Sequence, residues 1–285
     1  MTVEKIYLKE NYHVKGGELT CFIADMPFDE NRADWKRPAV IVVGGGGYAM
    51  VSKRESEPVA LRFLAKGFQA FCLKYDCMPQ GVKYPEQLLQ LACAVDYVKQ
   101  NATRFHVDER QVFAVGFSAG GHLVGNLSTD YMQALDAYGE ALDCKLAAAG
   151  LCYPVISAKY GHTGSFSNLL RGAEDKKEAL FQKVNLDEIV CARTVPAFIW
   201  ATAEDSVVPV ENSLQYARKL AREKISFELH IYPKGEHGLS TCDKELNGEK
   251  VFLSKNEKWL DDCASFFKDI VGKKFCGQNA LNEVL

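Results

Sequence analysis

Short apolar runs alternate along this chain with segments whose apolar residues recur every three or four positions. A continuous apolar strand is buried on both faces of a sheet, and a helix between two such strands is the connection that parallel strands need. The alternation predicts an α/β fold with a mostly parallel central sheet and helices on both faces. The expected strands cover residues 39–43, 68–75, 111–116, 146–154, 195–203 and 226–233, and the main expected helices cover residues 57–66, 85–102, 211–223 and 256–271, with another beginning near residue 119.

Two parts of the chain depart from this alternation. Segments 4–10 and 17–25 have the pattern of two antiparallel strands at a sheet edge. Residues 156–194, between two expected strands, form the least regular segment, and loops of that length in a compact domain usually serve function. Because we find no repeat, low-complexity stretch or linker, we expect one domain over residues 1–285, with a cap-like insertion at about 156–194.

Composition excludes several classes of protein. The net charge is −3 and the isoelectric point about 6.1, without a basic stripe, so neither nucleic acid nor a membrane surface is an expected partner. The N-terminus lacks the apolar core of a signal peptide, so we expect a cytoplasmic protein. The ten cysteines form no Cys-x-x-Cys pair, so we expect reduced thiols and no metal site. The oligomeric state stays open, a homo-oligomer included.

One strand ends in a motif with chemical meaning. The apolar run at 112–115 leads into GFSAG at residues 116–120, and a helix-like segment follows. G-x-S-x-G between a strand and a helix is the nucleophile elbow, a sharp turn that exposes a serine at the carboxyl edge of the sheet. The N-terminus of the following helix favours negative charge at that point. We therefore predict that Ser118 is a nucleophile.

A serine nucleophile needs a base and an acid that orients it. His237, in YPKGEHGLS, follows the last strand on a glycine-rich loop, and we predict that it is the base. His122, one helical turn beyond Ser118, is expected to be structural. Asp205 follows the strand at 195–203, and the order Ser118, Asp205, His237 is that of α/β-hydrolases. Its neighbour Glu204 is the alternative acid.

Four glycines at residues 44–47 follow the strand at 39–43. This is the position of the loop whose backbone N–H groups form an oxyanion hole, and we expect the donors to be Gly46, Gly47 and Ala119. No Lys-Ser/Thr follows the glycines and the G-x-G-x-x-G spacing is absent, so neither a phosphate-binding loop nor a dinucleotide cofactor is expected. Tyr48 beside the glycines and His162 in the insertion are candidates for substrate contact.

These segments together resemble the α/β-hydrolase superfamily, and in detail its acetyl-esterase branch, near acetyl-xylan esterases and xylanase-B-like hydrolases. The resemblance rests on VVGGGGYAMVSKRESEPVALRF, GFSAGGHL, CYPVIS, HTGSFSNLL, TVPAFIWATAEDSVVPVENSL and LHIYPKGEHGLS, which span most of residues 40–240. The chain departs from the family pattern at Gly44, where the family often has His or Pro before the glycines. The resemblance implies hydrolysis of carboxylic esters, with acetylated sugars or oligosaccharides as a candidate substrate class.

Four other functions are alternatives to a sugar acetylesterase. A general short-chain carboxylesterase would share the whole motif set. A lipase needs an apolar lid, whereas the insertion carries many charged residues. A peptidase of the prolyl type usually has a large extra domain, for which 285 residues leave no room. A non-catalytic binding protein of the same fold would be expected to lack at least one of Ser118, Asp205 and His237.

Overall fold

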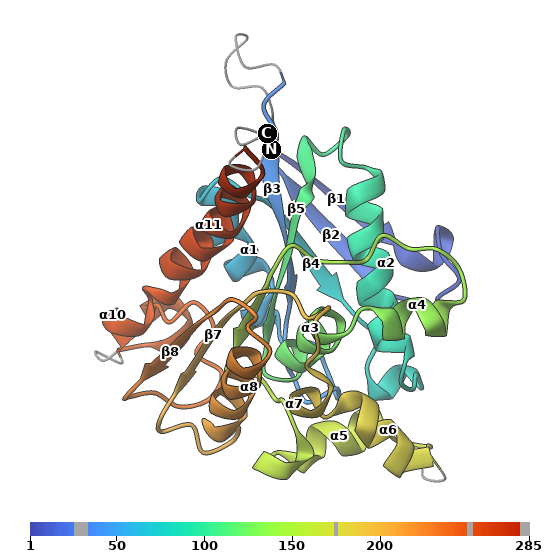
Figure 1. Cartoon of the computed structure of the whole chain (residues 1–285), viewed down its shortest axis with the longest axis vertical. Coiled ribbons are helices and arrows are strands. Elements are labelled where there is room, and N and C mark those ends of the chain that lie inside the picture. The colour runs from blue at the N-terminus through green and yellow to red at the C-terminus, as the bar shows by residue number, and fades with distance from the viewer. Residues whose placement is uncertain (26–33, 174–175, 250–252, 280–285) are drawn as a thin grey trace.

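A computed structural model of the chain describes residues 1–25, 34–173, 176–249 and 253–279. Within these residues, eight strands form one sheet in the order β1-β2-β4-β3-β5-β6-β7-β8 (Figure 1). The strands in chain order are β1 (Thr2–Tyr7), β2 (Glu18–Ile23), β3 (Arg37–Val43), β4 (Gln69–Lys74), β5 (Val107–Phe117), β6 (Ala149–Cys152), β7 (Ala197–Thr202) and β8 (Phe227–Tyr232).

The pairing of the strands confirms the predicted architecture. β1 pairs antiparallel with β2, and β2 pairs antiparallel with β4. Each remaining neighbour, from β4 through β3 and β5 to β8, pairs in parallel. The carboxyl ends of these parallel strands therefore meet at one edge, where open α/β sheets place their ligands.

Helices cover both faces of the sheet. In chain order they are α1 (Glu57–Ala65), α2 (Glu86–Gln100), α3 (Ala119–Thr129), α4 (Met132–Tyr138), α5 (Thr163–Leu169), α6 (Lys177–Val184), α7 (Leu186–Ile189), α8 (Glu211–Arg222), α9 (Lys244–Asn247), α10 (Leu253–Asn256) and α11 (Trp259–Asn279). Short 3₁₀ segments lie at Leu8–Glu10, Lys53–Glu55, Met78–Gln80 and Ala158–Tyr160.

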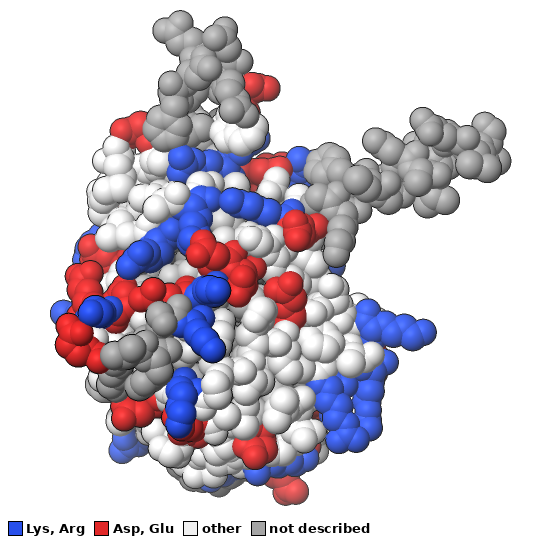
Figure 2. All heavy atoms as spheres, turned by 90° about the vertical axis from the view of Figure 1, so that its left-hand side faces the viewer, with Lys and Arg blue, Asp and Glu red and all other residues white. Residues whose placement is uncertain are grey.

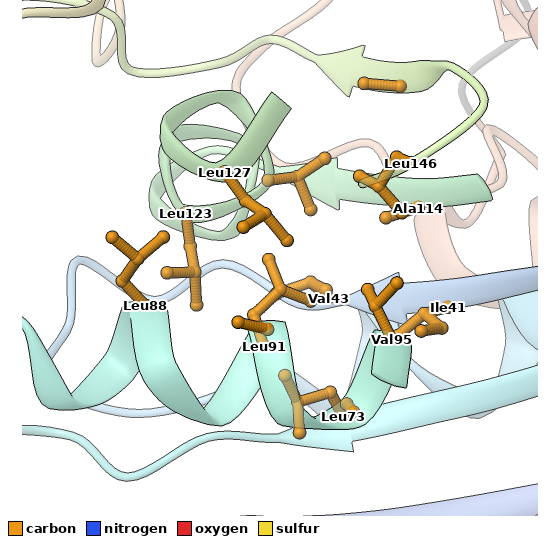
Figure 3. Close-up of a cluster of buried hydrophobic side chains, with 14 of the residues drawn as sticks. Ile41, Val43, Leu73, Leu88, Leu91, Val95, Ala114, Leu123, Leu127 and Leu146 are labelled. Carbon is orange, nitrogen blue, oxygen red and sulfur yellow. The ribbon is translucent and has the colours of Figure 1, made fainter. Parts of the chain in front are cut away.

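The apolar strands pack on both sides because alternate side chains point to opposite faces. Ile41 and Val43 of β3 belong to a core shared with α2, α3 and α8, and Figure 3 shows Leu91 of α2 and Leu127 of α3 beside Val43. Val42 of the same strand belongs to a second core, which α1 and α11 cover. Two cores on one sheet explain why its strands are continuously apolar.

The insertion at 156–194 is more regular than we expected. It holds a 3₁₀ segment and the short helices α5, α6 and α7, which Figure 1 shows grouped at one end of the molecule, beyond α3. Each of these helices is at most eight residues long, so the sequence holds too few helical turns for the apolar period to be visible. The same reason explains why α4, with seven residues, was not predicted.

The described surface carries charges of both signs (Figure 2), and the described cysteines are unpaired. On the face shown in Figure 2, basic and acidic side chains are interspersed around uncharged ones. Among the described residues, no helix has the length and apolarity needed to cross a membrane. The nine cysteines with described side chains are free thiols, eight of them buried.

Candidate active site

The turn between β5 and α3 holds Ser118 in a strained conformation, with φ 52° and ψ −118°. An added Cβ at Gly116 would lie 2.3 Å from the carbonyl oxygen of Gly120, and one at Gly120 would lie 2.3 Å from that of Val43. Neither position has room for a side chain, so glycine is needed at both. The strain at Ser118 is of the kind that structures retain at functional sites.

The elbow is anchored to the carboxyl end of β6. The N–H of Ser118 donates to the carbonyl of Cys152 at 3.0 Å, and the Ser118 carbonyl accepts from Val155 at 3.2 Å. An added Cβ at Gly121 would lie 3.0 Å from a carbon of Pro154, so α3 packs closely against the chain that follows β6. These contacts fix the direction of the serine side chain.

His237 and Asp205 lie next to this serine. Nε2 of His237 is 2.8 Å from Oγ of Ser118, and Nδ1 is 2.6 Å from Oδ2 of Asp205. Because Nδ1 faces a carboxylate, it carries the ring proton of the neutral imidazole, and Nε2 accepts the serine hydroxyl. The structure thus brings the three predicted residues together from the ends of β5, β7 and β8. The Ser118 residue is 5% exposed.

Asp205, rather than Glu204, faces the imidazole. The other oxygen of Asp205, Oδ1, accepts the backbone N–H groups of Val207 and Val208, both at 2.9 Å, so the carboxylate is held in a tight turn. Glu204 points outward and pairs with Lys234 at 2.6 Å. Hydrogen bonding from Lys234 lowers the pKa of Glu204. Glu204 therefore forms a surface ion pair and does not contact the imidazole.

The four glycines pass directly behind the elbow. An added Cβ at Gly45 would lie 2.8 Å from Cβ of Ser118. Gly46 and Gly47 have φ of 122° and 63°, which suit glycine. Within the described ranges, the N–H groups of Gly46 and Gly47 donate to no protein acceptor, and the N–H of Ala119, the first residue of α3, has no partner inside that helix. The N–H groups of Gly46 and Gly47 are thus left unbonded within these ranges, and the oxyanion role of the three residues stays a prediction.

Tyr48 requires a correction. It was a candidate for substrate contact, but the residue is 1% exposed, and its hydroxyl lies 2.7 Å from Nδ1 of His122. Nε2 of His122 is 2.7 Å from the carbonyl of Val184, so Nε2 must donate and Nδ1 must accept from Tyr48. Tyr48 thus connects the glycine loop to α3, and His122 connects α3 to Val184 of the insertion. The structural role predicted for His122 agrees with this geometry.

His162 lies at the start of α5, over the glycine loop. Its ring stacks on that of His237, with centroids 6.5 Å apart, and its Cε1 would be 4.0 Å from a Cβ added at Gly47. Nδ1 is 2.9 Å from Oγ of Ser165. Burial, with the nearby His237, lowers the pKa of His162. Both effects favour the neutral form of this half-buried ring, which stands at the side of the glycine loop.

Two residues near the site were missed at the sequence level. Nδ2 of Asn168 in α5 donates to the carbonyl of Gly47 at 2.8 Å, which holds the loop from the insertion side. The ring of Tyr153, directly after β6, contacts the ring of His237 edge-on, with centroids 5.0 Å apart. Both residues stand in segments that carry the family resemblance, CYPVIS and HTGSFSNLL. No catalytic motif assigns either of them a role, so only the three-dimensional arrangement shows what they contact.

Comparisons with known proteins agree with the fold. Residues 25–220 match the model of the BD-FAE family. The chain is 37% identical to the endo-1,4-beta-xylanase B of Butyrivibrio fibrisolvens over 75% of its length, and 27% identical to the acetylxylan esterase of Xylanibacter ruminicola over 90%. It covers 34% of the first protein and 49% of the second, so it spans about a third and about half of these relatives.

A solved structure is similar over nearly the whole chain. The acetyl ester-xyloside bifunctional hydrolase of Caldicellulosiruptor lactoaceticus superposes with a TM-score of 0.78 at 32% identity, over 94% of this chain and 96% of that one. A carboxylesterase of Lactobacillus plantarum, Cest-2923, gives a TM-score of 0.76 at 26% identity, over 98% of both chains. This chain belongs to the BD-FAE family of α/β-hydrolases.

Proposed function

We propose that the protein hydrolyses short acyl esters, acetyl esters of sugars above all, through an acyl-enzyme on Ser118. The observation that carries the proposal is the continuous hydrogen-bonded chain from Asp205 through His237 to Ser118. Beside it lie the N–H groups of Gly46 and Gly47, which find no protein acceptor among the described residues. A base that is held by a carboxylate and bonded to a serine hydroxyl is the arrangement of an activated nucleophile.

In the acylation step, Oγ of Ser118 attacks the ester carbonyl carbon while Nε2 of His237 takes the hydroxyl proton. The carbonyl oxygen becomes an oxyanion, and the N–H groups of Gly46, Gly47 and Ala119 stabilise it. When the C–O bond to the alcohol breaks, His237 gives the proton to the departing oxygen. The Asp205 carboxylate stabilises the imidazolium that exists between these two transfers.

Deacylation repeats the sequence with water as the nucleophile. Nε2 of His237 takes a proton from the water, and the resulting hydroxide adds to the acyl carbon. The same N–H groups stabilise the second oxyanion. The bond to Oγ of Ser118 then breaks, and the proton returns to Oγ. The net reaction converts an ester and water into an acid and an alcohol, and no cofactor is needed.

The surface of the insertion supports a small, water-soluble substrate. Among the described residues of the insertion, 156–173 and 176–194, no large hydrophobic side chain is prominently exposed, whereas a lipase lid would present several. The names of the acetylxylan esterase and of the acetyl ester-xyloside hydrolase support acetylated sugars in particular. His162 would contact the alcohol part of the substrate, because its ring lies between His237 and the glycine loop.

The experiment has two arms, with Ser118→Ala as the blank. Acetate release from acetylated xylo-oligosaccharides tests the sugar part. Rates with p-nitrophenyl acetate, butyrate and octanoate test the acyl part, and we expect at least a tenfold fall toward octanoate, equivalent to about 1.4 kcal/mol in the barrier. Acetate at the level of the blank would reduce the assignment to a general short-chain esterase, and rates that rise toward octanoate would contradict the short acyl site.

A further inference from the structure

A buried carboxylate to which the sequence motifs assign no chemical role lies behind the candidate site. Glu55 is 4% exposed and ends a short 3₁₀ segment on the chain that leaves the glycine loop. Its Oε2 accepts the backbone N–H of Gly45 at 2.8 Å, and its Oε1 accepts the hydroxyl of Tyr153 at 2.8 Å. Burying a carboxylate is costly unless donors satisfy it, so this placement requires an explanation.

The partners of Glu55 lead to two parts of the catalytic machinery. Gly45 immediately precedes the expected oxyanion donors and packs against Ser118. Tyr153 contacts the ring of His237, and its hydroxyl oxygen accepts the backbone N–H of Ser240 at 2.9 Å, on the loop that carries His237. One carboxylate thus connects the loop after β3, the end of β6 and the loop after β8.

We propose that Glu55 is a positioning residue, which sets the direction of the oxyanion N–H groups through Gly45 and the position of His237 through Tyr153 and Ser240. The inference rests on the proposed function, since it assigns Glu55 to the same oxyanion hole and base. Glu55 touches no reacting atom; it fixes the Gly45 peptide, and that peptide determines where the next two amides point.

The chemistry of the two contacts explains why a carboxylate is needed. Both partners of Glu55 are donors, and a carboxylate accepts on both oxygens. The Tyr153 hydroxyl already accepts from Ser240, so its proton must go to an acceptor. Burial and the Glu55 charge raise the pKa of Tyr153 well above its usual value, which keeps that proton in place. A glutamine has one acceptor oxygen and would leave one of the two donors facing an NH₂ group.

The chain offers a matched control, a second carboxylate in the same chemical situation away from the site. Asp96 in α2 is 6% exposed, and it accepts the hydroxyl of Tyr12 and the backbone N–H of Asp143, both at 2.7 Å. Substitution there removes the same kinds of contact without touching the glycine loop or His237. Glu55→Gln and Tyr153→Phe can therefore be compared with Asp96→Asn and Tyr12→Phe.

The experiment measures four quantities for the four variants: kcat and KM with p-nitrophenyl acetate, the inhibition constant of a trifluoromethyl ketone, and the urea midpoint of unfolding. The ketone forms an oxyanion on the serine, so its affinity reports the oxyanion hole separately from overall stability. We expect Glu55→Gln to lose roughly ten- to a hundredfold in kcat and a similar factor in ketone affinity, because a misplaced donor costs on that order, while KM stays within about threefold.

The controls decide the outcome. Asp96→Asn should lower the urea midpoint as much as Glu55→Gln does and leave kcat and ketone affinity unchanged. Equal kinetic losses in both pairs, or a Glu55→Gln enzyme with wild-type kcat and ketone affinity, would overturn the positioning role. Ser118→Ala is measured alongside: if that variant stays active, the proposed function fails, whereas an inactive Ser118→Ala with an unaffected Glu55→Gln refutes only the inference. Tyr153→Phe should reproduce a smaller part of the kcat loss.

Discussion

Two histidines of this protein, His122 and His237, each engage both ring nitrogens, yet their surroundings lead to different chemistry. His237 lies between a carboxylate and a serine hydroxyl, with its side chain 16% exposed. His122 lies between the Tyr48 hydroxyl and a backbone carbonyl, fully inside the core. Burial lowers the pKa of His122 to about 4. Two good hydrogen bonds therefore do not make a base: a histidine base needs a partner that stabilises its charged form.

The largest expected effect is on kcat, and it distinguishes the roles of His237 and His122. His237→Gln should lose roughly 10⁶ in kcat, as loss of a triad histidine does. His122→Gln should keep kcat within about tenfold, 1.4 kcal/mol in the barrier, since this ring contacts no reacting atom. Steady-state hydrolysis of p-nitrophenyl acetate by both variants gives the ratio. Comparable losses in the two variants would remove the distinction between them.

The second prediction tests which carboxylate orients His237. Asp205→Asn should cost roughly 10⁴ in kcat, because an amide at this position favours the wrong imidazole tautomer. Glu204→Gln removes a neighbouring carboxylate whose partner is an exposed lysine, and its kcat should stay close to that of the wild type. The comparison uses one substrate at saturating concentration. If Glu204→Gln is the more damaged variant, the acid assignment moves to Glu204.

The third prediction concerns stability and pH at His122. Between pH 6.5 and 4, the unfolded chain holds a proton on His122 that the folded chain does not. The difference in proton binding lowers the free energy of unfolding as pH falls from 6.5 toward 4. The total loss is roughly 3 kcal/mol, and above pH 6.5 this group causes no loss. Urea unfolding at pH 7.5 and 4.5 should show a smaller decrease for His122→Gln than for the wild type. Identical decreases would show that His122 does not titrate in this way.

The smallest effect is expected at Tyr48, on the other end of the His122 contact. Tyr48→Phe removes one buried hydroxyl and leaves Nδ1 of His122 without a donor, which should cost about 1–2 kcal/mol of stability. KM for soluble acetyl esters should not change, because the hydroxyl faces the core. A selective rise in KM with unchanged stability would instead return Tyr48 to the substrate-contact role that the sequence suggested.

The sequence predicts residues that follow visible strands, but it does not show the direction of an individual side chain. The meeting of Ser118, Asp205 and His237 was predictable because each follows a strand whose apolar run is visible, and parallel strands bring their carboxyl ends to one edge. Tyr48 was misassigned because its position beside the glycines gives no sign of the direction of its side chain. Glu55 stands in the charged run KRESE, which is typical of a solvated surface, so its burial depends on the fold of the glycine loop. The helices of the insertion are too short to produce a periodic signal.

The most direct test of the account is to trap the acyl-enzyme that His237 is proposed to generate. Wild type, Ser118→Ala and His237→Gln are mixed with p-nitrophenyl acetate, quenched in acid within milliseconds, and analysed by intact mass and peptide mapping. We expect one acetyl group per chain on Ser118 in the wild type, and none in either variant at the same quench time. An acetyl group on another side chain, or Ser118 acetylated equally fast without His237, would contradict it.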